Sequence, residues 1–164
     1  MSSMTKPSST AAVQFDPNWK AIMECAAVEV FELMAGVHME LIAMQGEEPQ
    51  GEQTAMVGMA GALCGMTTLR CSRTTAAKLA ALMLGGDAAS NPSMARDALG
   101  ELCNMIAGNF KAKVSNLADR CMLSVPTVIT GENYSMDTVP PTEGVTLSLS
   151  YEDEPIFVSL ITHS

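Results

Sequence analysis

Apolar residues recur with helical spacing between residues 91 and 117, and this pattern predicts the longest helix of the chain. Asn91 followed by Pro92 is a typical helix start, because the asparagine side chain can cap free backbone N–H groups and proline already has the φ of a first turn. Apolar residues then follow at steps of three, four and seven, as on one face of an α-helix: Ala95, Leu99, Leu102, Ile106, Phe110 and Leu117. We therefore expect this face to be buried.

The opposite side of this predicted helix is largely polar. Glu101 lies roughly 140° round the helix from the centre of the apolar stripe, and Asn104 follows three residues later, so the two side chains are neighbours. Gly108, one turn further on, has no side chain to block an approaching molecule. We predict a docking face on this side of the helix, to which seven residues belong: Asp97, Ala98, Glu101, Asn104, Met105, Gly108 and Lys111.

Shorter periodic segments predict two more helices and about six strands. Helices are expected at 17–35 and from a cap at Ser72 or Thr74 to Gly85. The strand-like segments are 37–45, 54–71, 121–131 and 145–162, of which the second and fourth are predicted to be hairpins. The glycines of the first hairpin are expected where two backbones approach closely, and Pro126 is expected at a sheet edge or a bulge because it cannot donate a hydrogen bond.

This order of elements predicts an α+β fold, in which two long helices and a shorter one pack on a mostly antiparallel sheet. Polar connections are expected at 46–53 and 133–144. Residues 1–15 are rich in serine and threonine and are expected to form a flexible tail, followed by a single domain at 16–164. A chain of 164 residues is long enough to bury its own core.

Two segments of the sequence echo one another without a gap, at 26–36 and 98–108. Four positions of the first segment are identical in the second, with apolar pairs between them: Ala26, Glu29, Ala35 and Gly36 match Ala98, Glu101, Ala107 and Gly108. We infer an internal pseudo-repeat of one long helix plus strands. At the position that corresponds to Asn104, the first segment has Glu32 instead. If the carboxylate–amide pair is the active feature, the chain therefore has one site in the second segment and an altered copy of it in the first. We interpret Glu29 and Glu32 as surface charges.

The composition narrows the classes of partner. The chain is 48% hydrophobic but only 4% aromatic, so the core must be aliphatic, with many of the 14 methionines in it. A formal net charge of −9 disfavours nucleic acid and anionic membranes, since phosphate groups are bound by clustered lysine and arginine. A partner with a basic surface would be complementary to this charge.

Cysteine and histidine usage argues against several kinds of site. The five cysteines form no CxxC pair, which is typical of reduced thiols in a cytoplasmic protein. The chain has two histidines, so we expect no metal site, and a Ser-His-Asp triad would depend on His38. The first dozen residues lack the apolar segment of a signal peptide, and no run of about 18 apolar residues could span a membrane. We therefore expect a cytoplasmic protein.

Three stretches carry a family resemblance: RDALG (96–100), ELCNMIAGN (101–109) and LSVPTVITG (123–131). They contain a Glu-x-x-Asn pair inside a D-A-x-x-E-x-x-N-x-x-x-G frame and a PTV-x-x-G strand, and the first predicted helix ends in MAG. With these motifs the chain resembles the CheX branch of the CheC/CheX/FliY chemotaxis phosphatases over about residues 17–162. The pair alone is not specific, but within this frame it is.

The resemblance implies a fold and an activity. Proteins of this family have the CheC-like fold and hydrolyse the aspartyl-phosphate of the response regulator CheY. The resemblance implies that Glu101 and Asn104 are the catalytic pair and that the partner regulator, rather than this chain, binds Mg²⁺. CheC proteins tend to carry the motif on both long helices and CheX-like proteins on one, so Glu32 fits the second group, whose members are typically homodimers.

The chemistry of the two side chains agrees with these roles. A carboxamide both donates and accepts hydrogen bonds, so Asn104 can hold a water in line with the phosphorus without adding negative charge. A solvent-exposed carboxylate would repel the phosphoryl oxygens, so Glu101 is better suited to pairing with a partner lysine than to general base catalysis.

Other interpretations stay open from the sequence. Glu101 and Asn104 could be two solvated residues on a polar helix face, and Met105 and Lys111 could be exposed rather than partner contacts. The chain could also be a non-enzymatic module of the same fold that binds a receiver domain or dimerises. Gly100 has no evident role in the helix, and close helix packing is its simplest explanation.

Overall fold

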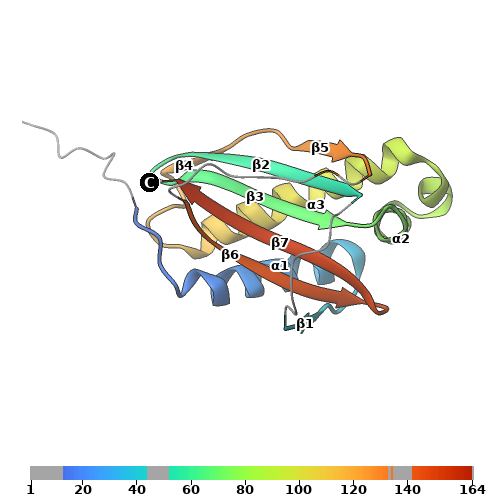
Figure 1. Cartoon of the computed structure of the whole chain (residues 1–164), viewed down its shortest axis with the longest axis horizontal. Helices are drawn as coiled ribbons and strands as arrows, with labels where there is room; N and C mark the ends of the chain where they lie inside the picture. The colour runs from blue at the N-terminus through green and yellow to red at the C-terminus, as the bar shows by residue number, and fades with distance from the viewer. Residues whose placement is uncertain (1–12, 44–51, 133, 135–141, 164) are drawn as a thin grey trace, which may run out of the picture.

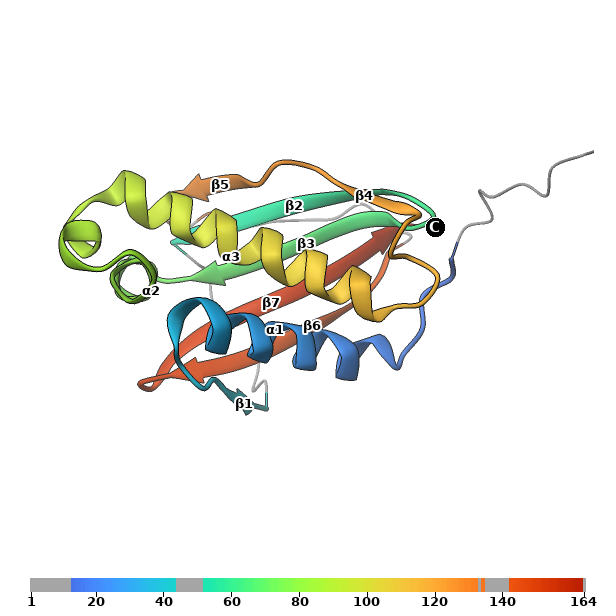
Figure 2. The ribbon, with the colours of Figure 1, turned by 180° about the vertical axis from the view of Figure 1, so that it is seen from behind.

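A sheet with helices on one of its faces makes up the protein (Figures 1 and 2). The computed structural model describes residues 13–43, 52–132, 134 and 142–163. The helices are α1 (Trp19–Ala35), α2 (Arg73–Leu84), the 3₁₀ helix η1 (Gly86–Ser90) and α3 (Pro92–Lys113). The strands are β1 (Glu40–Ile42), β2 (Gln53–Gly61), β3 (Cys64–Cys71), β4 (Cys121–Leu123), β5 (Thr127–Thr130), β6 (Thr142–Tyr151) and β7 (Glu154–His163).

The strands lie in the order β1-β6-β7-β3-β2-β4, and β5 also pairs with β2. Every pairing among the described residues is antiparallel. Both predicted hairpins are confirmed, as β2–β3 and as β6–β7, and the second turns at Glu152 and Asp153 with φ of 50° and 62°. At Gly65 of β3 a Cβ atom would lie 2.3 Å from the carbonyl oxygen of Ile161, so the predicted close approach of backbones is confirmed there.

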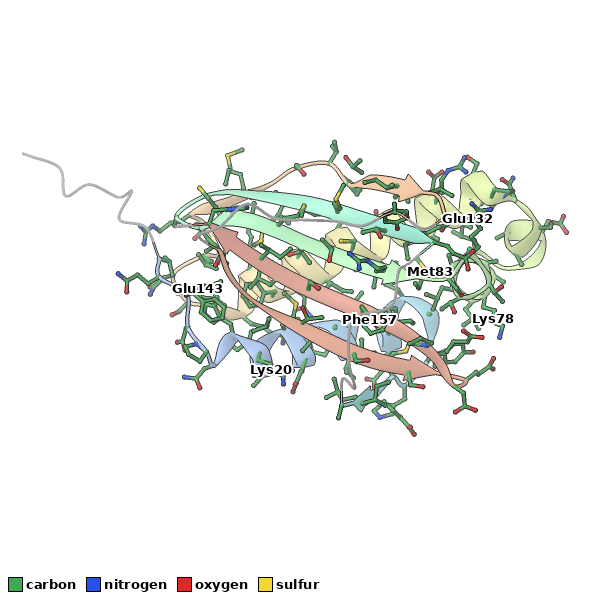
Figure 3. The ribbon with its side chains drawn as sticks, viewed as in Figure 1. Lys20, Lys78, Met83, Glu132, Glu143 and Phe157 are labelled. Carbon is green, nitrogen blue, oxygen red and sulfur yellow. The ribbon has the colours of Figure 1, made fainter. Side chains whose placement is uncertain are left out.

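α1 and α3 lie side by side across the same face of the sheet, and α2 lies near one end of α3 (Figure 2). On β7, Ile156 and Val158 point into the core beneath the helices, whereas Phe157 points to the other face of the sheet (Figure 3). The core is mostly aliphatic, as the composition predicts, and its main aromatic contact is an edge-to-face pair of Trp19 and Phe110, 5.7 Å between ring centroids. The predicted α+β class and the three helices are confirmed.

Several boundaries differ from the prediction. α1 begins at Trp19 rather than at 17. α3 ends at Lys113 rather than reaching Leu117, because Val114 is extended; Leu117 still reaches the core from a turn in which its N–H donates to the Val114 carbonyl. The segment 121–131 forms two short strands, β4 and β5, separated at Pro126, and β1 occupies only three residues of 37–45. η1 was not predicted. Most of the connections predicted at 46–53 and 133–144 lie outside the described residues.

The predicted tail at 1–15 falls largely outside the described residues as well. Of its last three residues, Val13 donates its N–H to the Ala62 carbonyl, and Phe15 packs edge-to-face on Trp19 at 5.6 Å. Both side chains contact the core, so this part of the predicted tail packs against the domain. The echoed segments 26–36 and 98–108 lie in α1 and α3 on the same face of the sheet, while the pseudo-repeat itself stays a prediction.

Candidate functional site

The local sequence fixes the orientation of α3. Asn91 caps the helix as predicted, with its side-chain oxygen accepting hydrogen bonds from the backbone N–H groups of Ser93 and Met94 at 3.1 and 3.3 Å. The fully buried residues Leu102, Ile106 and Phe110 hold one face of the helix in the core. The opposite face must therefore point away from the sheet, and this is where the predicted docking face lies.

Glu101 and Asn104 both lie on this outward side. Glu101 is exposed and Asn104 is half-buried. Within the described part of the chain, neither side chain has a hydrogen-bond or ion-pair partner. The predicted orientation of the pair is confirmed, and both side chains are available to another molecule.

A groove of about 450 Å³ lies beside Asn104, between α1 and α3. We call it the α1–α3 groove, and three elements supply its lining: Glu29, Val30 and Leu33 from α1, Asn104, Met105, Gly108 and Asn109 from α3, and Leu123 from β4. Asn104 thus lines a mostly apolar groove, whereas Glu101, one turn earlier in α3, does not belong to the lining. The contributions of α1 and β4 were not predicted, because no local pattern in the sequence links these residues to α3.

The other predicted docking residues divide into two groups. Asp97 is exposed, and Met105 and Gly108 line the α1–α3 groove. Ala98 is only 3% exposed, so its assignment to the docking face is wrong. The reason is that α2 and η1 cover this flank of the helix, where Ala98 packs with three other alanines: Ala80, Ala88 and Ala95.

The side chain of Lys111 forms a hydrogen bond within the protein. Its ammonium donates to the carbonyl oxygen of Cys121 in β4 at 2.5 Å, and the side chain is half-buried. This contact joins the C-terminal part of α3 to the edge of the sheet. The place of Lys111 in the docking face stays a prediction, and contact with a partner would compete with this hydrogen bond.

The two glycines of α3 have different surroundings. A Cβ atom at Gly100 would lie 3.4 Å from Pro126 and 3.5 Å from Val128, so this glycine faces the β4–β5 connection and β5. We expected another helix to pack there instead. A Cβ atom at Gly108 would meet one heavy atom within 4 Å, Leu123 Cδ1 at 3.9 Å. Gly100 is therefore closely surrounded by other segments, whereas Gly108 has open space beside it.

Glu29 ties α1 to α3. Its carboxylate accepts a hydrogen bond from Asn109 Nδ2 at 2.9 Å and forms an ion pair with Lys113 Nζ at 2.9 Å. The hydrogen bond from Asn109, followed by those from Lys113 and Cys25, lowers the pKa of Glu29 from 4.5 to about 2. Glu29 is thus a surface charge, as interpreted from the sequence, but one whose oxygens are already occupied.

The second glutamate of the first echoed segment is paired as well. Glu32 Oε1 lies 2.7 Å from His38 Nδ1, on the exposed surface. Among the described residues, no serine or cysteine side chain forms a hydrogen bond with His38, so nothing in this part supports a triad centred on it.

Among the described residues, no group of three or more His, Cys, Asp or Glu side chains could hold a metal ion. None of the described helices combines the length and the hydropathy that a membrane span requires.

Comparison with known proteins identifies the family. The family model of the chemotaxis phosphatase CheX matches residues 53–150, which include the Glu101–Asn104 pair. This chain belongs to the CheX family. Among curated proteins, no sequence matches it.

Solved structures show the same fold. CheX of Desulfovibrio desulfuricans is 21% identical, with a TM-score of 0.78 over 89% of this chain and 99% of that chain. The structure of the CheX-CheY-BeF3-Mg²⁺ complex of Borrelia burgdorferi matches with 22% identity and a TM-score of 0.75, covering 92% of this chain and 100% of that chain. Thermotoga maritima FliY is more distant, with 20% identity, a TM-score of 0.62 and 92% of each chain covered. The CheC-like fold and the family resemblance are confirmed.

Proposed function

We propose that this protein hydrolyses the aspartyl-phosphate of a CheY-like response regulator through Glu101 and Asn104. The observation that carries the proposal is that both side chains stand on the outward side of α3 with no partner in the described part of the chain. The match to the chemotaxis phosphatase CheX supports the reaction. A protein of similar fold, from Borrelia burgdorferi, has been crystallised with CheY, BeF3 and Mg²⁺, which supports the partner.

The roles of the two residues follow from their charge. Asn104 holds the attacking water in line with the phosphorus, since its amide can accept one hydrogen bond from the water and donate another to a phosphoryl oxygen. Glu101 pairs with a lysine of the regulator and so sets the register of docking. The regulator contributes the phosphorylated aspartate and Mg²⁺, and this chain needs no bound cofactor.

We further propose that the protein acts in the cytoplasm as a homodimer. β1 pairs only with Ser148–Ser150 of β6, so among the described residues the outer edge of β6 from Thr142 to Leu147 has no strand partner. Such an edge can pair with the same edge of a second copy. Light scattering after size-exclusion chromatography tests this, and a monomer at all working concentrations would contradict it.

The decisive experiment is a phosphate-release assay with a phosphorylated CheY-type receiver domain and Mg²⁺. Asn104→Ala should lower the rate of hydrolysis by about 100-fold or more, because the water loses its positioning group, while the affinity for the receiver domain is retained. Glu101→Ala should weaken binding too. Asn116→Ala is the matched control, since Asn116 is an exposed asparagine beyond the end of α3.

Two outcomes would contradict the proposal. If Asn104→Ala releases phosphate as fast as the wild-type protein, the catalytic assignment fails. If the wild-type protein forms a saturable complex with the receiver domain and does not accelerate phosphate release, the chain is a non-enzymatic binding module. The altered first echoed segment, with Glu32 in place of asparagine, is the feature that favours this second function.

A further inference from the structure

We propose that the α1–α3 groove receives one apolar side chain of the docked receiver domain, and that it thereby helps to select the regulator. This inference rests on the proposed function, because it concerns the same face of α3. It adds an anchoring site that adjoins the Glu101–Asn104 pair, because Asn104 belongs to its lining.

The walls of the groove suit an apolar occupant. Val30 and Leu33 of α1, Met105 of α3 and Leu123 of β4 contribute aliphatic side chains. Leu33 is 75% exposed, so it extends the apolar lining of the groove to the surface of the protein. The one carboxylate in the lining, Glu29, is already paired with Lys113 and Asn109, so the groove presents no unsatisfied charge to an incoming group.

Gly108 gives a second, independent indication of an occupant. Glycine inside a helix is unfavourable relative to alanine, and a Cβ atom at this position would clash with nothing in the protein. The packing of this chain therefore does not require glycine here. The absence of a side chain at this position of the lining instead leaves room for a group that comes from outside.

The charge of this face points to a basic partner rather than to a second copy of the chain. Asp97 and Glu101 are exposed on the outward side of α3, and neither is paired within the described residues. Lys113 is held by Glu29, and Lys111 by the Cys121 carbonyl, so the neighbouring cations are engaged. Two identical copies placed face to face would bring like charges together, whereas a receiver domain that offers lysine beside an apolar side chain is complementary.

The groove is also continuous with the proposed site. Asn104 belongs to its lining, so a side chain seated in the groove would contact the residue that is proposed to position water. Seating of that side chain would place the receiver domain against Asn104 while Glu101 engages its lysine one turn away. Two contact points, the groove and Glu101, fix the orientation of a partner better than one.

The test is the steady-state kinetics of phosphate release with a purified CheY-type receiver domain, phosphorylated with acetyl phosphate in Mg²⁺. Leu33→Asn replaces an apolar side chain of the lining by a polar one, and Gly108→Leu adds a large side chain to the lining and so fills part of the groove. Each should raise KM about tenfold or more and leave kcat nearly unchanged, because apolar burial is lost while Asn104 is intact. Leu84→Asn is the matched control, since Leu84 is 53% exposed at the end of α2, away from the groove, and KM should not change.

The outcomes separate this inference from the proposed function. If the wild-type protein releases phosphate but both groove variants keep its KM, the groove inference fails and the catalytic proposal stands. If these variants change the mass of the protein in light scattering and not KM, a second copy occupies the groove and the inference is overturned. If the wild-type protein does not accelerate phosphate release at all, the proposed function fails and the groove inference fails with it.

Discussion

Replacing Gly108 by alanine should make the folded protein more stable, although Gly108 lies on the face proposed to be functional. Glycine in a helix interior is about 0.5–1 kcal/mol less favourable than alanine, since more backbone freedom is lost on folding. The added Cβ would meet only Leu123 Cδ1, at 3.9 Å, which is an ordinary van der Waals contact. No steric strain offsets the gain, so Tm should rise by about 1–4 °C for a chain of this size.

Thermal unfolding followed by circular dichroism measures this change, and urea unfolding followed by fluorescence of the single tryptophan, Trp19, gives the free energy. Gly100→Ala is the matched control, because it is the same exchange in the same helix. Its Cβ would lie 3.4–3.5 Å from Pro126 and Val128, so crowding should cancel part of the gain and the rise in Tm should be smaller. A lower Tm for Gly108→Ala than for the wild-type protein would refute the reasoning, since it would show that the position needs glycine for folding.

Three further predictions concern packing and titration. Phe110→Ala should lower the free energy of unfolding by about 3–5 kcal/mol, measured by urea unfolding, because Phe110 is fully buried against Trp19. Burial raises the pKa of Cys103 to about 12, so a thiol reagent at pH 8 should modify exposed Cys64 in the native protein and Cys103 only after unfolding. Mass spectrometry measures this, and equal rates of modification of the two cysteines in the native protein would contradict it. The pKa of Glu29 is lowered from 4.5 to about 2, so its contribution to stability is complete above pH 4.5 and is lost as pH falls towards 2. The difference in urea midpoint between the wild-type protein and Glu29→Gln should therefore shrink over this range. A constant difference would count against the ion pair.

The sequence predicted the fold and the orientation of α3 because both follow from local patterns. The apolar period of α3 and the Asn91 cap are properties of consecutive residues, and they determine which side of the helix faces outward. The alternation of Val145, Leu147 and Leu149 likewise predicted one buried face of β6. Features of this kind need no knowledge of the partner elements.

What the sequence did not predict depends on contacts between distant segments. Ala98 lies at a helical position that could face outward, and only the approach of α2 and η1 buries it. Gly100 lies against Pro126, which is far away in the sequence. The α1–α3 groove is lined by Leu33 and Leu123 together with residues of α3, and no spacing along the sequence predicts that these residues lie close together. The pair of polar residues could therefore be predicted from the sequence, but the α1–α3 groove beside it could not.

The two echoed segments carry glutamates at matching positions, Glu29 and Glu101, but their surroundings are opposite. Glu29 is held by Asn109 and Lys113, both of which belong to α3, so the carboxylate of the first segment serves to hold the two long helices together. Glu101 has no such partner in the described part of the chain. The same ion pair occupies the carboxylate of Glu29, which belongs to the lining of the groove, and links α1 to α3 there. If the protein is a phosphatase, one substitution at Asn104 should therefore suffice to abolish its catalysis, because the first segment has no free carboxylate and no amide to replace it.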